Sequence, residues 1–257
     1  MIKKFSIILI VFVVLVGGNF VFAKNDKNND KNIDIPEQDG VYDVPGHHEL
    51  KVRVFVHRIG GKPGPTSTLQ CNLSDPDSLT VVDSAGWKLP STWTYNLNPS
   101  SVPSSVGSSY LSTIAANAFK EWGGAVNEVN IKRGLDTTIN RKGYDGKNIV
   151  AWGSASSSAL AVTYIWYYPS TGLVAEVDTI MNTKFFWMWS GGSSTCAWSN
   201  AYDAQDILTH ELGHWFGLDD EYTSAYVNNT MYGYGSKMDA KADTLTTGDI
   251  LGVKTIY

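Results

Sequence analysis

The segment HELGHWFGLDD, residues 210–220, constrains this chain of 257 residues more than any other part of its sequence. Apolar residues recur at helical spacing from about residue 203 to residue 216, which predicts a helix there. His210 and His214 are four residues apart, so both lie on one face of that helix and can direct their imidazoles at one metal ion. Glu211 lies one position further round, where its carboxylate can reach a water molecule beside that ion and act as general base.

A third metal ligand is expected shortly after this helix. Gly217 follows His214 by three residues, and glycine can adopt the positive φ that ends a helix and turns the chain back. The histidines of the whole chain are His47, His48, His57, His210 and His214. None follows the motif, so a carboxylate must complete the site, and the spacing favours Asp220 over Asp219 and Glu221. Two imidazoles and one carboxylate leave a fourth position open, as in catalytic zinc sites; a solvated helix face with two histidines is the alternative.

The N-terminus predicts export. Residues 1–23 contain two lysines, an apolar run and small residues before Lys24, which is the pattern of a secretory signal peptide. An uncleaved membrane anchor is disfavoured, because the apolar stretch is shorter than the ~20 residues that span a bilayer. Cleavage would leave a secreted, extracellular protein with a formal net charge of -7 and no membrane association. Without a basic field, nucleic acid is not an expected partner.

Three further regions follow the signal peptide. Residues 24–45 are polar and rich in Asn, Asp and Lys, so we expect a flexible linker. Residues 46–91 are interpreted as an N-terminal extension or pro-segment. Within them, residues 49–59 alternate between valines and polar residues, which predicts a strand with one buried face and with His57 among the solvated or strand-face residues. Residues 92–257 form the main domain.

The main domain combines helical and strand patterns. Apolar residues at helical spacing predict a helix over about 108–122, capped by Ser108 or Ser109 and ended by Gly123 and Gly124. Residues 93–97 and several runs between 147 and 190 predict strands laid against that helix. The aromatic run 185–189 is more typical of sheet core than of an exposed binding surface. A capping-box-like start at Thr246 predicts a last helix over about 247–256.

These motifs resemble those of the metzincin clan of zinc metallopeptidases. Residues 210–220 fit the metzincin consensus HExxHxxGxx followed by His or Asp, and Thr230-Met231-Tyr232 resembles the Met-turn beneath the zinc. Within the clan the chain is matrixin-like over about residues 92–257. The matching segments are 118–122, which resembles the first matrixin helix, 175–182, which resembles the strand before the active-site helix, and 245–257, which resembles the closing helix. Matrixins usually carry histidine at the position of Asp220, whereas some bacterial metzincins resembling snapalysin use aspartate.

The resemblance implies an α+β fold and an activity. The implied fold has a twisted mixed sheet with an antiparallel edge strand over the cleft, two long helices, the second being the active-site helix, a Met-turn and a small C-terminal subdomain. The implied activity is zinc-dependent hydrolysis of internal peptide bonds in a protein or peptide substrate. One catalytic zinc ion would be held by His210, His214 and Asp220, with Glu211 as general base and Met231 as a hydrophobic floor. An extended substrate would pair with an edge strand, for which residues 158–162 are the candidate.

Other residues have open assignments. Tyr232 and Tyr234 follow the Met-turn, where a hydroxyl could stabilise the oxyanion or the ring could form a wall of the S1' pocket. Cys71 and Cys196 most simply form one disulfide in a secreted protein, and the alternative is that Cys71 blocks the zinc. The scattered Asp178, Asp203 and Asp206 do not establish a calcium site. The second, structural zinc of animal matrixins is not expected, because no histidine lies between residues 58 and 209.

Two competing functions remain. The first is a catalytically inactive secreted binding or adhesion protein on a metzincin fold, although such a protein has no chemical need for Glu211. The second is a structural metal module, which the open fourth ligand position disfavours. Substrate specificity would depend on the loops at about 221–244, and whether residues 24–91 are removed is open. No sequence feature indicates an oligomeric state.

Overall fold

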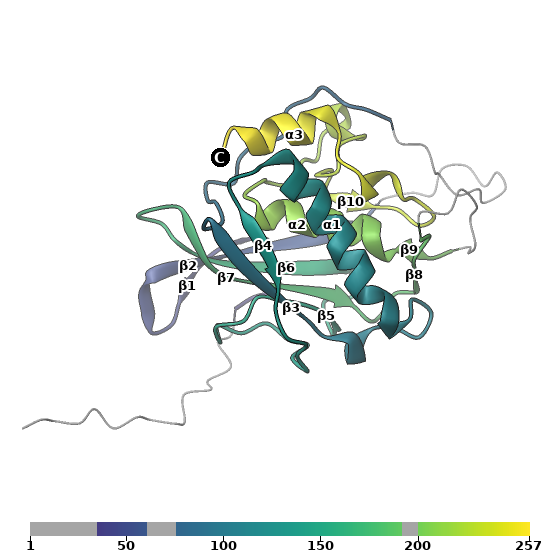
Figure 1. Cartoon of the computed structure of the whole chain (residues 1–257), viewed down its shortest axis with the longest axis horizontal. Coiled ribbons are helices and arrows are strands. Elements are labelled where there is room, and N and C mark those ends of the chain that lie inside the picture. The colour runs from purple at the N-terminus through teal and green to yellow at the C-terminus, as the bar shows by residue number, and fades with distance from the viewer. Residues whose placement is uncertain (1–34, 61–75, 192–199) are drawn as a thin grey trace, which may run out of the picture. The chain divides into compact units, whose positions relative to one another are not determined.

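The computed structural model describes residues 35–60, 76–191 and 200–257. The expected signal peptide 1–23, the first part of the expected linker, and both Cys71 and Cys196 lie outside the described residues. The described part has an α+β architecture, in which a mixed sheet carries helices on one side (Figure 1). The expected α+β class is therefore confirmed.

The main sheet joins strands from distant parts of the chain. Its order is β1-β2-β6-β7-β5-β3-β4, and β10 pairs with β2 beside this path. The strands are β1 (Gly40–Val44), β2 (His47–Ile59), β3 (Thr92–Leu97), β4 (Asn130–Arg133), β5 (Ile149–Gly153), β6 (Ala159–Tyr168), β7 (Leu173–Asn182) and β10 (Tyr234–Gly235). β3, β4, β5 and β7 are parallel, whereas β6 is antiparallel to both of its neighbours, β2 and β7. A second, short sheet pairs β8 (Trp187–Met188) with β9 (Tyr202–Asp203).

The described residues form three α-helices: α1 (Leu111–Ala125), α2 (Ala204–Trp215) and α3 (Thr247–Lys254). All three were predicted within a few residues. The start and end of α1 differ from the prediction: no side chain caps it at Tyr110, and it continues through Gly123 and Gly124 to Ala125. The two glycines do not end the helix because its apolar face, which includes the fully buried Trp122, holds it against the core.

The core occupies both faces of the sheet. The larger cluster lies between the sheet and the helices and includes the buried Trp122, Trp152, Trp187 and Trp215. The smaller cluster lies on the opposite face and includes Val52, Val54 and Val56 of β2. The aromatic run 185–189 is only partly core, because Trp187 is buried whereas Phe186 is 54% exposed.

The N-terminal segment departs from the prediction. The expected linker 24–45 is wrong for its last residues, since Ile35 is 3% exposed and β1 pairs with β2. The strand expected at 49–59 exists, but it is buried on both faces from Val54 to His57, where it pairs with β6 and its side chains contact α2. Residues 46–59 are therefore part of the main sheet, and only their connection to residue 76 lies outside the described residues.

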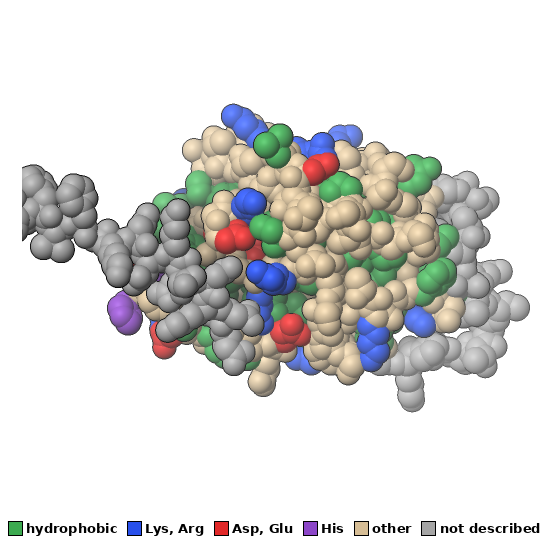
Figure 2. All heavy atoms as spheres, turned by 90° about the horizontal axis from the view of Figure 1, so that it is seen from below, with side chains coloured by type: hydrophobic (Ala, Val, Ile, Leu, Met, Phe, Trp, Pro, Cys, Tyr) green, Lys and Arg blue, Asp and Glu red, His purple; other side chains and the backbone are tan. Residues whose placement is uncertain are grey.

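Two observations concern membranes and nucleic acid. None of its helices combines the length and the apolar character needed to cross a bilayer. Figure 2 views the molecule from below the view of Figure 1, and on that face basic and acidic side chains of the described residues are interspersed. This mixture agrees with the formal net charge of -5 and provides no continuous basic surface there for a phosphate backbone.

Candidate metal centre

Helix α2 carries the motif and is buried along its whole length. Its start is fixed by Asp203, whose Oδ1 accepts hydrogen bonds from the backbone N–H of Gln205 (2.8 Å) and Asp206 (3.1 Å). The other oxygen, Oδ2, accepts from the N–H of Ser190 at 2.8 Å. Asp203 thus caps the start of α2 and connects it to Ser190, which follows β8.

Three side-chain atoms converge at the C-terminal end of α2. Asp220 Oδ1 lies 3.2 Å from His210 Nε2 and 3.5 Å from His214 Nε2. Each histidine has its Nδ1 bonded to a backbone carbonyl, His210 to Thr230 (2.8 Å) and His214 to Leu218 (2.9 Å). A carbonyl only accepts, so each Nδ1 carries the proton and each Nε2 is directed at the other two atoms. This is the arrangement that orients metal-binding histidines.

These three atoms are buried without a hydrogen bond to any other group among the described residues. The side chains of His210, His214 and Asp220 are at most 2% exposed. Burial alone would raise the pKa of Asp220, but His214 and His210 lower it well below its usual range, so the carboxyl is ionised. A buried cluster of two imidazoles and one carboxylate, all within 4.8 Å of one another, can hold a metal ion.

The turn after α2 brings Asp220, and not its neighbours, to the histidines. Gly217 has φ +102°, and a Cβ there would overlap the backbone oxygen of Trp87. The two other candidates have different partners: Asp219 forms an ion pair with Arg53 (3.5 Å), and Glu221 accepts a hydrogen bond from the N–H of Asp83 (3.1 Å). Of the three carboxylates, only Asp220 contributes to the cluster.

Met231 packs directly against the helix that carries the histidines. It is fully buried, and a Cβ at Gly213 would overlap its sulfur. Asp249 holds this turn: its carboxylate accepts hydrogen bonds from the backbone N–H of Thr230 (2.9 Å) and Met231 (3.3 Å). The same carboxylate closes the predicted capping box of α3 with Thr246. The buried Asp249 therefore connects the start of α3 to the turn that contains Met231.

Glu211 has two partners that sequence reasoning missed. Its Oε1 lies 3.1 Å from Nδ1 of His57, and its Oε2 accepts a hydrogen bond from Thr163 Oγ1 at 2.6 Å. His57 lies on one face of β2 and is buried, so the strand-face alternative is correct and the solvated alternative is wrong. Burial and the neighbouring His210 lower the pKa of His57, so it is a neutral imidazole that donates its Nδ1 proton to Glu211. His57, His210 and Glu211 also place three potential ligand atoms within 4.8 Å of one another.

Sequence pattern gave little signal for these partners. His57 and Glu211 are 154 residues apart, and Thr163 lies in an apolar strand where threonine is common. The signal that was available is that His57 is the one histidine in the alternating run 49–59. Thr163 in turn contacts Thr179 on β7 at 2.6 Å, and Trp215 donates to that hydroxyl at 2.9 Å. A polar row therefore crosses the sheet beneath Glu211.

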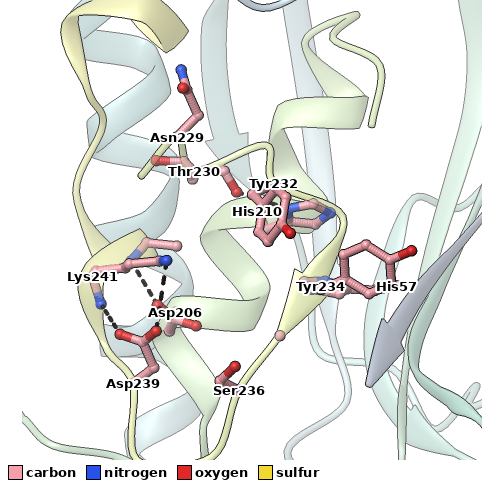
Figure 3. Close-up of a pocket in the computed structure, with 12 residues that line it drawn as sticks. His57, Asp206, His210, Asn229, Thr230, Tyr232, Tyr234, Ser236, Asp239 and Lys241 are labelled. Atoms are coloured by element: carbon pink, nitrogen blue, oxygen red, sulfur yellow. Dashed lines mark hydrogen bonds and ion pairs between the residues drawn. The ribbon is translucent and has the colours of Figure 1, made fainter. Parts of the chain in front are cut away.

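A small cavity opens beside His210 (Figure 3). Tyr232 and Tyr234 both line it, together with His57 from β2. Its unfilled space is about 270 Å³, including the part open to solvent, and its far side carries Asp206 and Asp239. Tyr232 and Tyr234 therefore both lie at the candidate site, where they form one wall of this cavity. The two tyrosine rings contact each other, with centroids 5.5 Å apart.

The scattered aspartates have structural partners. Asp178 accepts hydrogen bonds from the backbone N–H of Gly143 (2.9 Å) and Ile149 (3.3 Å), and Asp206 accepts from that of Ala242 (2.6 Å). Burial raises the pKa of both carboxyls. With Asp203 at the start of α2, each of the three holds a different loop or helix end, and they do not meet at one point.

Comparison with protein-family models finds no match to this chain, and comparison with curated proteins finds none either.

Proposed function

We propose that the protein is a zinc-dependent endopeptidase. The observation that carries the proposal is the convergence of His210 Nε2, His214 Nε2 and Asp220 Oδ1, three buried atoms without other hydrogen-bond partners, next to the carboxylate of Glu211. Two neutral imidazoles and one carboxylate form a donor set that suits zinc and leaves a fourth position open for catalysis. The fold is proposed to be metzincin-like on the same motif, with Met231 beneath the histidines.

When bound, zinc would polarise the scissile carbonyl and lower the pKa of the attacking water. Glu211 accepts the proton of that water and passes it to the leaving amine. Thr163 donates to Oε2 of Glu211 and so fixes the direction of the carboxylate. Tyr232 and Tyr234 form one wall of the space beside His210, which a substrate side chain would enter.

The test uses zinc content and peptide turnover together. We expect one zinc ion per chain, lost in His210→Ala and Asp220→Ala and kept in the matched control Asp219→Ala. Glu211→Gln should keep zinc and lose about 10²-fold or more in turnover of a quenched-fluorescent peptide library. Both the intact chain and the chain cut between Gly60 and Pro76 are assayed, because β2 covers the site. Turnover that persists in Glu211→Gln, or after chelation, would overturn the proposal.

An inactive binding or adhesion protein is the second candidate. It is favoured by one observation, namely that both oxygens of Glu211 are already bonded within the fold, to His57 and Thr163. In that case zinc would bind stoichiometrically, and neither the intact nor the cut chain would hydrolyse any peptide of the library.

A further inference from the structure

Strand β2 lies next to the metal centre, with β6 on one side of it and β1 and β10 on the other. It runs antiparallel to β6, with the pairs Val56–Val162 and His57–Ala161. On its other side β2 pairs in parallel with β10, and beyond this pair the N–H of Gly60 donates a hydrogen bond to the carbonyl of Gly235 at 2.8 Å. Residues 158–162 were expected to offer a free edge to substrate. They do not, since β2 already pairs with them from Ala159 onward.

Alternate side chains of β2 cover the site. Arg53, Phe55 and His57 share one face of the strand, because side chains of a strand alternate. Phe55 stacks on the ring of His214, with centroids 3.7 Å apart and planes 6° apart. His57 lies over Glu211 and places its ring 3.9 Å from that of His210.

The third side chain extends this cover to the turn after α2. Arg53 pairs with Asp219 at 3.5 Å and lies 4.1 Å from the centre of the Phe55 ring. A peptide chain in the position of β2 thus passes directly over two of the three metal-binding side chains and over the general base.

We propose that β2 occupies the position of the substrate and keeps the site closed, so that the protein is active only when β2 leaves. The inference rests on the proposed function and adds its regulation. An extended substrate that pairs with β6 needs the same backbone groups that β2 uses, and the two chains cannot pair with that edge at once. Because β2 belongs to the same chain, its effective concentration at the site is in the millimolar range, which a substrate at lower concentration does not displace.

The structure also indicates which residues would leave and which would stay. β1 pairs with β2 alone among the described strands, so both would leave as one hairpin. Residues 76–91 would stay, because they are bonded to the site from the other side. Trp87 donates to the carbonyl of His214 at 2.9 Å, and the N–H of Ala85 donates to that of Gly217 at 2.8 Å. The expected extension 46–91 thus consists of a covering part and a supporting part.

The rest of the sheet has its own support after the hairpin leaves. β3, β5 and β7 pair with one another in parallel, and β6 pairs with β7. The larger core cluster, which packs the helices against the sheet, would lose only Phe55 from β2. The smaller cluster on the opposite face would lose the hairpin residues Val44, Leu50, Val52, Val54 and Val56.

The experiment cuts the chain between β2 and residue 76 with a site-specific protease. A recognition sequence for a site-specific protease is inserted between Gly60 and Pro76 of the full chain, and the zinc-loaded protein is assayed before cutting, after cutting, and after separation of the N-terminal fragment. We expect turnover of the peptide library to rise about tenfold or more on separation. A synthetic peptide of residues 47–60 should restore inhibition, whereas the same peptide with alanine at positions 53, 55 and 57 should not.

Binding is measured separately from turnover with the labelled 47–60 peptide and the Glu211→Ala chain. The separated form should bind this peptide, and the intact form should not. Equal turnover before and after separation would overturn the inference and leave the endopeptidase proposal standing. Peptide binding to the separated form without turnover in the wild type would overturn the endopeptidase proposal and leave β2 as the strand that closes the groove. Unfolding on separation would overturn the inference, because β2 would then be an essential part of the core.

A second variant tests the inference without cutting. Phe55→Ala removes the ring that stacks on His214 and should raise the turnover of the intact chain severalfold. Leu97→Ala is the matched control, because it opens a cavity in the same core cluster from β3, which does not pair with β2. Equal turnover in the two variants would contradict the inference.

Discussion

Two glycines set how closely the parts of the metal centre approach one another. Gly213 lies between the two histidines on α2 and has no side chain to separate the helix from Met231. Gly217 has a positive φ and lies against the backbone of Trp87, so the chain can reverse and present Asp220 to the histidines. A larger residue at Gly213 would displace Met231, and a larger residue at Gly217 would displace the backbone of Trp87.

The first prediction concerns Gly213→Ala. The added methyl group overlaps Met231, and overpacking of this kind costs about 1–3 kcal/mol of unfolding free energy. Zinc affinity should fall as well, because the carbonyl of Thr230 beside Met231 orients His210. Urea denaturation and zinc titration measure the two effects.

The control for that prediction is Gly123→Ala in α1. A Cβ at Gly123 meets no atom within 4 Å, so the substitution should raise stability by about 0.4–1 kcal/mol through helix propensity and loss of backbone freedom. A neutral effect of Gly213→Ala on both stability and zinc binding would contradict the close packing of Met231.

At the scale of elements, carboxylates on β7 hold the loop that precedes β5. Glu176 accepts hydrogen bonds from the backbone N–H of Asp145 (2.7 Å) and Gly146 (2.6 Å), and it is 2% exposed. Burial raises the pKa of Glu176 from 4.5 to about 7. Asp178, two residues further along the strand, shares this environment and also has a raised pKa.

The second prediction is a pH dependence of stability. Because the pKa of Glu176 is higher in the folded state, the folded protein binds more protons than the unfolded one between about pH 4.5 and pH 7. The free energy of unfolding should therefore fall as pH rises through this window and level off above it. In Glu176→Gln the unfolding free energy should fall by on the order of 1–2 kcal/mol less over this window, a size that solvent screening limits. Urea denaturation from pH 4 to pH 8 measures the unfolding free energy of both proteins. The same dependence of unfolding free energy on pH in both would contradict the assignment to Glu176.

The helices were predictable from sequence because their signals are local. The apolar spacing of α1, the capping box of α3 and the His-x-x-x-His spacing of α2 all involve residues within one or two turns. The strand β1 was missed because it lies in a polar segment and buries only alternate side chains. Its stability comes from pairing with β2, which a local pattern does not contain.

The candidate site was predictable only in part, for the same reason. His210, Glu211 and His214 follow from one motif, and Asp220 follows from the turn at Gly217. His57, Phe55 and Thr163 reach the site from strands, and no spacing rule connects them to the helix. Thr163 and His57 are 48 and 154 residues away from Glu211, which both contact.

At the scale of the whole molecule, binding of a metal ion at the candidate site would be linked to stability. The three candidate ligand atoms come from α2 and from the turn after it, and that turn is bonded to residues 83–87. A metal ion that binds only the folded chain stabilises it by about 2.7 kcal/mol at a free concentration one hundred times Kd.

The third prediction follows from this linkage. Excess zinc should raise the Tm of the intact chain by about 5–10 °C over that of the chelated chain. His210→Ala should abolish the shift, whereas Asp219→Asn should keep it, because Asp219 pairs with Arg53 and not with the histidines. Differential scanning fluorimetry with and without chelator measures it. A shift of the same size in His210→Ala would show that zinc acts elsewhere.

The pairing of β2 also determines the order in which the chain can fold. The β1–β2 hairpin is local and turns at Gly46, whose φ is +83°, so it can form soon after it is synthesised. Its partners on the sheet lie more than one hundred residues later, and β10 is close to the C-terminus. Loop closure over such separations is slow. We therefore expect the β1–β2 hairpin to be among the last of the described elements to dock, so that the candidate metal centre stays open until the other described strands have paired.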